Sequence, residues 1–468
     1  MKKFLRIITF IILTTAILLG LYRVFSWKDT HASTFSSIHQ LEYSPDQTID
    51  IAFVGSSHVY MGITPAVLWG RSGVSSFDMA ISGMDKYSSY YYTKHLLKTQ
   101  SPKIVVVDLL GYSFEEHGVL SNEYRNMMSM PMSLEAIQLV RAYASDDLEK
   151  QKEYILRWPV VHTRYKELKK HDFVDSGAGL YGKGNGNAID NGGNADLSIV
   201  SYEIPEISET NKKVIDDFVA LSQEEGFRLI FIVTPYSQSY EEQSTYNSIG
   251  NYLQTLGIEY VNGNAYAAEI GLDGNLDFFD PGHMNTAGAE KFTNWLANTF
   301  QLEAGLDDHR GDLKYDTWQQ DFDAYNRRKV IKQLEEYGKT ANYPELVSNM
   351  MNTPDLLYIV SLDGAWQEST LEYNEFMNPL GLSKEMAPNG GTWICDEGKM
   401  CFVMDNSSTE DFYYRIDNGD VIRISKKYTE TLENIKIGDE VCQVAYKGMS
   451  FILYDKQGGK IIAKLGMF

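Results

Sequence analysis

The stretch Ile51-Ala52-Phe53-Val54-Gly55-Ser56-Ser57-His58 joins a short apolar run to a polar turn that starts with glycine. The run has no alternation of apolar and polar side chains, which is typical of a strand buried on both faces of a parallel sheet. Similar runs follow at 104–110 and 229–233. The three runs predict a parallel sheet that is covered by helices on both sides.

Helical patterns lie between and after these runs. Val214, Phe218 and Leu221 recur on one helix face, and Gly226 is a suitable end for that helix. A second helix is expected to begin near Asn285. Strands that alternate with helices predict an α/β fold in the form of a three-layer sandwich.

The C-terminal part has a different pattern, and it predicts a smaller, β-rich domain. Asn418-Gly419 predicts a hairpin with a type I′ turn, because this pair accepts positive φ angles. We expect an N-terminal segment at 1–30, the α/β domain at 31–340, a linker at 341–352 and the β-rich domain at 353–468, which should fold alone. The expected strands are 356–361, 400–404, 412–416, 421–425, 441–446, 451–454 and 461–464.

The N-terminus predicts a single membrane-spanning helix. Lys2, Lys3 and Arg6 precede an uncharged run at 7–22, which places the N-terminus inside and the remainder outside the cytoplasm. A cleaved signal peptide is the alternative, although Thr30-His31-Ala32 is a poor cleavage site. Both alternatives give an extracytoplasmic domain, and the first places the protein in the cell membrane.

Composition and cysteine usage narrow the possible partners. The 468 residues include 42 basic and 63 acidic side chains, for a formal net charge of −21, so we expect no nucleic acid partner. Cys395 and Cys401 could form a bridge across a hairpin. Alternatively, these two cysteines and Cys442 could all be buried thiols. The spacing of the cysteines does not predict a zinc site, and no cofactor or metal is expected. The glycine-rich stretch 176–196 predicts a loop.

Two short motifs predict chemistry only when they are taken together. Ser57 follows the first strand, where an α/β enzyme can display a nucleophile, although a serine there is more often a cap or turn former. Asp280-Pro281-Gly282-His283 precedes the last helix of the domain, and its spacing lets the carboxylate orient the imidazole. The pair of motifs predicts a triad of Ser57, His283 and Asp280.

This arrangement resembles the SGNH (GDSL-like) hydrolase and acyltransferase superfamily. It is most similar to membrane-anchored SGNH proteins related to DltD and to polysaccharide O-acetyltransferases. The resemblance implies Ser57 as nucleophile, His283 as general base, Asp280 as its orienting carboxylate, and the N–H groups of Ser57 and Gly83 as the oxyanion hole. The stretches that carry it are 54–63, 80–83, 103–108, 280–285 and 307–312.

The sequence departs from the family pattern in its third block. The family has Gly-x-Asn-Asp there, and this chain has Gly111-Tyr112-Ser113-Phe114. One oxyanion donor is therefore missing, so another group substitutes, the enzyme is slow, or the acyl group arrives on an activated carrier. His58, next to the nucleophile, is expected in substrate binding or packing and not as the base.

The resemblance implies an anchored enzyme that transfers an acyl group, with acetyl as the expected one, through Ser57 to a cell-envelope polysaccharide or teichoic acid. It also implies a membrane-bound O-acyltransferase as partner. A carbohydrate esterase with the same triad and a weakly active, glycan-binding scaffold protein are the alternatives. The stretches 414–422 and 447–455 resemble an ILEI-type domain, which implies a glycan-binding or packing module.

Overall fold

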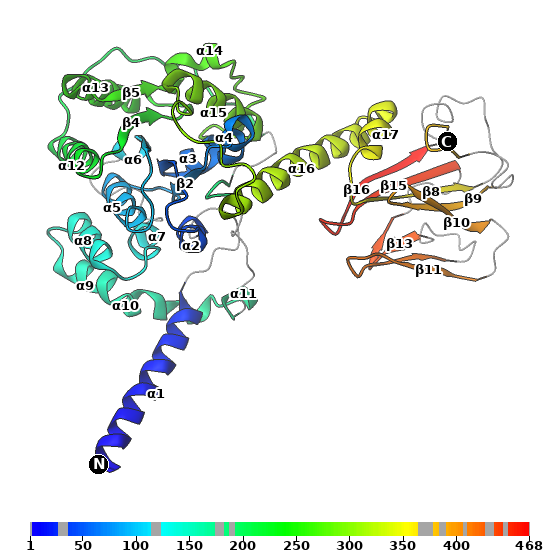
Figure 1. The fold of residues 1–468 in the computed structure, drawn as a ribbon, viewed down its shortest axis with the longest axis horizontal. Helices are drawn as coiled ribbons and strands as arrows, with labels where there is room; N and C mark the ends of the chain where they lie inside the picture. Colours follow the sequence, from blue (N-terminus) through cyan, green and yellow to red (C-terminus); the bar gives the residue numbers. More distant parts are fainter. Residues whose placement is uncertain are drawn as a thin grey trace. The chain divides into compact units, whose positions relative to one another are not determined.

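The computed structural model describes residues 2–26, 36–113, 123–173, 182–186, 192–363, 378–382, 390–405, 410–425, 435–442 and 448–467 (Figure 1). The expected cleavage site at 30–32, Phe114 of the third block and the segment 443–446 lie outside these residues. The chain divides into two compact units, Met1–Tyr325 and Asn326–Phe468.

The first unit is built on the predicted parallel sheet. Its five strands have the order β2-β1-β3-β4-β5, and every neighbouring pair is parallel. The three apolar runs are confirmed as strands, whereas β2 and β5 were not predicted, because polar residues such as Asp78 interrupt their apolar pattern. The strands are β1 (Ile51–Gly55), β2 (Ser76–Ala80), β3 (Ile104–Asp108), β4 (Arg228–Val233) and β5 (Glu259–Asn262).

Helices cover both faces of this sheet. Ala52 and Val54 of β1 point into one apolar cluster with α2, α5, α8, α12 and α13, while Ile51 and Phe53 point into the other with α3, α4 and α15. Burial on both faces explains why the strands read as unbroken apolar runs. The helices are α2 (Ser36–Tyr43), α3 (Ser57–Gly62), α4 (Pro65–Ser72), α5 (Lys86–Leu96), α6 (Leu110–Ser113), α7 (Glu123–Met128), α8 (Leu134–Tyr143), α9 (Leu148–Leu156), α10 (Trp158–Val161), α11 (Lys170–Phe173), α12 (Glu209–Glu225), α13 (Tyr240–Leu256), α14 (Ala267–Ile270) and α15 (Thr286–Phe300).

Both predicted helices are present, and their ends follow from local capping. Ser208 accepts a hydrogen bond from Asn211 at the start of α12, and Gly226 ends that helix with φ +79°. Asn285 accepts hydrogen bonds from the N–H groups of Ala287 and Gly288 at the start of α15. These side chains satisfy N–H groups that a helix leaves without partners at its first turn.

The N-terminal helix α1 (Lys2–Phe25) is long and apolar enough to cross a membrane, which fits an anchor or a signal sequence. Its last turn is held by the folded part of the unit. Arg164 donates hydrogen bonds to the carbonyl oxygens of Phe25 (2.7 Å) and Ser26 (2.8 Å), and it pairs with buried Asp172. An arginine at this position complements the negative end of the helix dipole.

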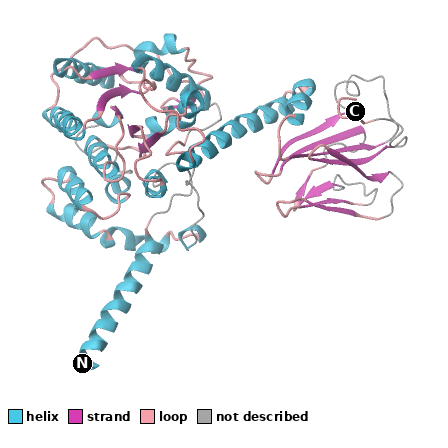
Figure 2. Cartoon of the chain, viewed as in Figure 1, coloured by secondary structure: helices cyan, strands magenta, loops and turns pink. Residues whose placement is uncertain are grey.

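The second unit is built mainly of strands (Figure 2). A five-stranded antiparallel sheet has the order β10-β9-β8-β15-β16, and a four-stranded sheet has the order β11-β12-β13-β14. Ile359 and Ile452 of the first sheet share an apolar cluster with Ile422 and Ile437 of the second. The strands are β8 (Leu356–Asp363), β9 (Gly390–Asp396), β10 (Lys399–Asp405), β11 (Phe412–Arg415), β12 (Val421–Ile424), β13 (Ile435–Ile437), β14 (Glu440–Val441), β15 (Gly448–Asp455) and β16 (Lys460–Met467).

The boundary between the units differs from the expected one. The division falls inside the long helix α16 (Asp316–Lys339), and the segment expected to be a linker at 341–352 contains the helix α17 (Tyr343–Met351). Leu346, Val347 and Met350 of α17 pack with Ile331 and Leu334 of α16 against the five-stranded sheet. The sequence suggested a linker because the polar helical stretch 318–338 ends just before it and strand-like segments follow. The buried residues of α17 show that this segment belongs to the core of the second unit.

One further expectation in the second unit changes, and one of two open alternatives is found for Cys395 and Cys442. The turn between β11 and β12 has a positive φ only at Gly419 (+99°), so it is not the type I′ turn that needs two such residues. Asn418 instead uses its side chain, donating hydrogen bonds to Tyr454 Oη and Lys456 O (both 2.9 Å). Cys395 and Cys442 are buried thiols, and the side chain of Cys401 lies outside the described residues.

Candidate active site

The turn after β1 places Ser57 at the carboxyl edge of the sheet. Ser56 is the N-cap of α3 and accepts a hydrogen bond from the His58 N–H at 3.3 Å, so Ser57 becomes the first helical residue. Gly55 is required here, because a Cβ would lie 2.7 Å from Val59 and 2.8 Å from Asp108. The edge lies between β1 and β3, where the strand order reverses direction and where ligands bind in open α/β sheets.

Asp280 and His283 lie on a short hairpin formed by β6 (Phe278–Asp280) and β7 (His283–Met284). The two residues face each other across the hairpin, so their three-residue spacing comes from a β-turn. The carboxylate accepts a hydrogen bond from the Gly282 N–H (2.8 Å), which fixes the turn. Ser237 supports the same turn by donating its N–H to the Pro281 carbonyl oxygen (2.9 Å).

The structure brings the three predicted residues together. His283 Nε2 lies 2.8 Å from Ser57 Oγ, although 226 positions separate the two residues. His283 Nδ1 lies 2.9 Å from Asp280 Oδ1 and 3.0 Å from Oδ2. A carboxylate can only accept, so Nδ1 carries the proton and Nε2 is left to accept the serine proton. This is the geometry of a nucleophile, a base and an orienting group.

His58 lies beside the triad and not within it. Its ring is 5.6 Å from the His283 ring and 4.4 Å from the Tyr236 ring, and the side chain is buried. Burial lowers the pKa of His58 well below its usual value, and the nearby His283 lowers it further, against a hydrogen bond with the Gly282 backbone. A neutral imidazole therefore packs beside the β6–β7 hairpin, which agrees with packing, one of the two roles expected for His58.

Gly83 lies in the loop after β2, and this loop is attached directly to the nucleophile turn. The Ile81 N–H donates to the Gly55 carbonyl oxygen (3.1 Å), and Gly83 has φ +62°. Within the part of the chain that the structure describes, the Gly83 N–H donates no hydrogen bond. This N–H is therefore available to stabilise negative charge.

Asn126 of α7 was missed in the sequence, and it holds the Gly83 loop. Its side-chain Nδ2 donates to the Gly83 carbonyl oxygen at 2.9 Å, and Tyr92 Oη donates to the Asn126 carbonyl oxygen at 3.0 Å. Asn126 is buried. No sequence signal marks it, because the contact joins two segments that are 43 positions apart.

The third block has a structural explanation. Gly111 lies at the start of α6, where a Cβ would be 2.3 Å from the Met84 carbonyl oxygen, so the glycine allows α6 to approach the Gly83 loop. Asp108 accepts hydrogen bonds from the N–H groups of Leu110 and Thr234 (both 3.0 Å), while burial raises its pKa to about 6. The block therefore shapes the loop that carries Gly83.

The stretch 307–312 does not contribute side chains to the triad. His309 Nε2 lies 2.8 Å from Asp50 Oδ2, and its ring stacks on Tyr315 at 3.9 Å. Asp50 precedes β1, so this contact lies at the opposite edge of the sheet from Ser57. Among the described residues, no group of three His, Cys, Asp or Glu side chains is placed to hold a metal ion.

Solved structures match this chain, whereas family models and curated sequences do not. One matching solved structure is a candidate acylhydrolase from Bacteroides fragilis NCTC 9343, with 12% identity, a TM-score of 0.30, and coverage of 59% of this chain and 98% of that chain. Another is a gut microbial diltiazem-metabolizing enzyme, with 14% identity, a TM-score of 0.25, and coverage of 55% of this chain and 48% of that chain. Matches at these identities and TM-scores show no activity for this chain.

Proposed function

We propose that this protein is a serine acyltransferase of the cell envelope, which carries an acyl group, acetyl in the simplest case, on Ser57 and passes it to a polysaccharide hydroxyl. The observation that carries the proposal is the chain of contacts from Ser57 Oγ through His283 to the Asp280 carboxylate. Ser57 is buried but at the strand edge, and His283 is partly exposed, so a substrate carbonyl can approach the hydroxyl.

The acylation step follows from these positions. Ser57 Oγ forms a bond to the acyl carbon while its proton moves to His283 Nε2, and Asp280 stabilises the imidazolium that results. The oxyanion is stabilised by the N–H groups of Ser57 and Gly83. The leaving group then departs with the proton from Nε2, and acyl-Ser57 remains.

The second step returns the enzyme to its starting state. An acceptor hydroxyl gives its proton to Nε2 and attacks the acyl carbon, the bond to Oγ breaks, and Ser57 regains the proton. With a polysaccharide hydroxyl as acceptor, the product is an O-acylated glycan. The donor in the cell would come from a membrane-bound O-acyltransferase, and teichoic acid is the other acceptor that the family resemblance implies.

A carbohydrate esterase is the second candidate, and one observation favours it. The side chains of His283 and Asp280 are 28% and 42% exposed, so water can reach the base. Water would then take the place of the acceptor hydroxyl and release a free acid. The two activities share every residue of the first step.

The proposed location rests on α1. Arg164 caps the end of this helix, while Phe25 packs edge-on against Trp158 with their rings 5.9 Å apart. These contacts support a retained anchor, because cleavage after α1 would separate the helix from the groups that hold its end.

The test uses the full-length protein in detergent with p-nitrophenyl acetate. After an acid quench, mass spectrometry should find one acetyl group on the peptide that contains Ser57. Adding a neutral oligosaccharide should divert acetyl from water to the sugar if the enzyme is a transferase, whereas an esterase would release acetate alone. An acetyl group on any other residue would refute the assignment of the nucleophile.

A further inference from the structure

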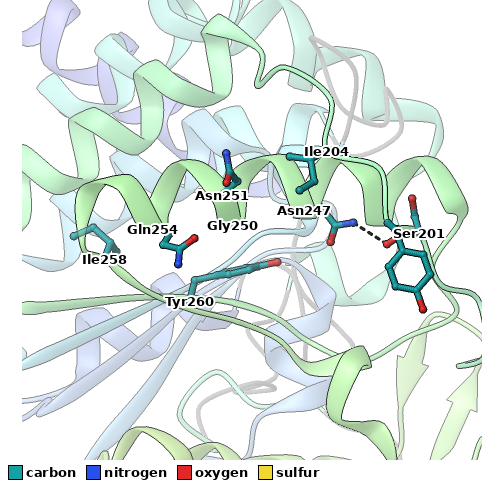
Figure 3. A pocket seen from close by; sticks show the side chains of 9 residues that line it. Ser201, Ile204, Asn247, Gly250, Asn251, Gln254, Ile258 and Tyr260 are labelled. Carbon is teal, nitrogen blue, oxygen red and sulfur yellow. Dashed lines mark hydrogen bonds between the residues drawn. The ribbon is translucent and has the colours of Figure 1, made fainter.

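A pocket of about 560 Å³ opens in the first unit along α13 and the edge strand β5 (Figure 3). Its lining contains two aromatic rings, Tyr202 and Tyr260, and three side-chain amides, Asn247, Asn251 and Gln254. None of its lining residues is Lys, Arg, Asp or Glu, although the chain has 105 such residues. The volume lies within the range of small-ligand sites.

One wall of the pocket is the extended segment 201–205, whose backbone groups form hydrogen bonds with side chains of α13. Gln243 Oε1 accepts a hydrogen bond from the Ser201 N–H (2.6 Å), and Asn247 Nδ2 donates to the Ser201 carbonyl oxygen (2.8 Å; Figure 3). Ser248 Oγ donates to the Pro205 carbonyl oxygen (2.6 Å). With its backbone fixed, the segment leaves Tyr202 88% exposed. The aromatic ring is thus presented to solvent from a fixed backbone.

The other ring, Tyr260, is held in one orientation. A Cβ on Gly250 would lie 2.4 Å from Tyr260 Cε1, so the missing side chain lets α13 pack directly on the ring. Tyr260 Oη donates to the Tyr246 carbonyl oxygen (3.2 Å), and burial raises the pKa of the Tyr260 hydroxyl, which stays protonated. Figure 3 shows this ring alongside the helix turn that carries Gly250 and Asn251.

We propose that this pocket binds a neutral sugar unit of the acceptor polysaccharide, which deepens the proposed function and rests on it. Sugar rings offer an apolar face to aromatic side chains and hydroxyl groups to amides, and amides can both donate and accept. The lining has no cation to pair with phosphate, and the net charge of −21 disfavours a polyanion. A neutral polysaccharide therefore fits the pocket better than a teichoic acid.

The chain that leads into this wall of the pocket also contacts the region of the β6–β7 hairpin, which carries Asp280 and His283. The Gly193 N–H donates to the Phe278 carbonyl oxygen (3.1 Å), and the Asp196 N–H donates to Ser237 Oγ (2.7 Å), while Ser237 in turn holds Pro281. From Gly193 to Tyr202 an extended chain spans at most roughly 30 Å. A polymer of several sugars is long enough to reach from the pocket toward the triad.

The experiment measures binding of chitotetraose and cellotetraose, two neutral sugar tetramers, to the full-length protein in detergent by saturation-transfer NMR. Tyr202→Ala, and separately Asn251→Ala combined with Gln254→Ala, should weaken binding of at least one tetramer fivefold or more. Tyr165→Ala, which removes a tyrosine that is 59% exposed outside the lining, is the matched control and should bind as the wild type does. All variants should hydrolyse p-nitrophenyl acetate within twofold of wild type.

Three results would overturn the inference. The first is that the lining variants bind the tetramers as tightly as the wild type does. The second is that neither tetramer binds at concentrations up to about 10 mM. The third is that tetragalacturonate, an acidic tetramer, binds equally well through the same residues. Ser57→Ala separates this test from that of the proposed function. It should bind the tetramers normally, so an error in the nucleophile would show in ester turnover and leave the binding result intact.

Discussion

The two units of this chain share a layered design and differ in where their polar side chains gather. In the first unit, Ser57 comes from a distant part of the sequence and meets the Asp280–His283 hairpin beside the carboxyl ends of parallel strands. In the second unit, Lys456 pairs with Asp396 (2.7 Å) and Glu397 (3.0 Å), and Arg327 pairs with Asp455 (2.6 Å). These charges satisfy one another, which is a structural role.

The difference follows from strand direction. Parallel strands all end at one edge, so the loops that follow them converge and can build a site from distant residues. Antiparallel strands place successive loops at opposite ends of the sheet, so such convergence needs a further device. Catalysis should therefore depend on the first unit alone.

The largest effect concerns the boundary of the second unit. We expect a fragment of residues 326–468 to fold, and a fragment of residues 353–468, the boundary that the sequence suggested, to remain unfolded. The shorter fragment lacks the buried side chains of α16 and α17, which together contribute roughly 10 kcal/mol, as much as the whole stability of a typical domain. Circular dichroism and urea titration of both fragments measure this. Cooperative unfolding of the shorter fragment would contradict it.

The next effect is on catalysis. Ser57→Ala should lower p-nitrophenyl acetate turnover by about 10³-fold or more, because the triad acts as a unit. Lys456→Met in the second unit should lower thermal stability, since it leaves Asp396 without its buried partner, but should keep turnover within twofold. A comparable loss of turnover in both variants would mean that the β-rich unit takes part in the site.

The strands and the triad, which depend on local sequence pattern, could be predicted from the sequence. The runs at 51–54 and 229–233 identified buried strands, because a strand that is buried on both faces has apolar residues at nearly every position. The triad was predicted from two motifs that stand at element ends. The contact of Asn126 with the Gly83 loop and the packing of α17 were missed, because they depend on which segments the fold brings together.

Asp280→Asn should lower turnover by roughly 10²–10⁴-fold while the fold is kept. The amide oxygen can still accept from the Gly282 N–H, but an uncharged amide does not stabilise the His283 imidazolium, and its NH2 group can donate to Nδ1 in the wrong tautomer. Asp196→Asn, an exposed carboxylate on the neighbouring segment, is the control and should leave turnover unchanged. Full activity of Asp280→Asn would refute the orienting role.

A pH effect of about 1–2 kcal/mol is expected from His58. Its pKa in the folded state is lowered, mainly by burial and then by His283, so below about pH 6.5 the unfolded chain binds a proton that the folded protein does not. Stability should therefore fall as the pH drops from 7 to 5, by up to about 1.4 kcal/mol per pH unit from this group. His58→Gln removes that part of the slope. Urea titrations of both proteins at pH 7 and pH 5 measure the difference, and equal slopes would contradict it.

The smallest effect concerns Asn126 as a positioning residue for the Gly83 loop, which supplies a proposed oxyanion donor. Asn126→Ala removes the donor to the Gly83 carbonyl oxygen and leaves that loop free to shift, which should lower kcat roughly tenfold, less than the ~10²–10³-fold cost of losing an oxyanion donor outright. KM for a small ester should stay within about twofold, because the loop contributes to the transition state and not to ground-state binding. A purely structural role would lower stability and leave kcat of the folded protein unchanged. Asn126→Gln, which keeps the amide one methylene further out, should recover part of kcat if positioning is the cause. An unchanged kcat in Asn126→Ala would refute the positioning role.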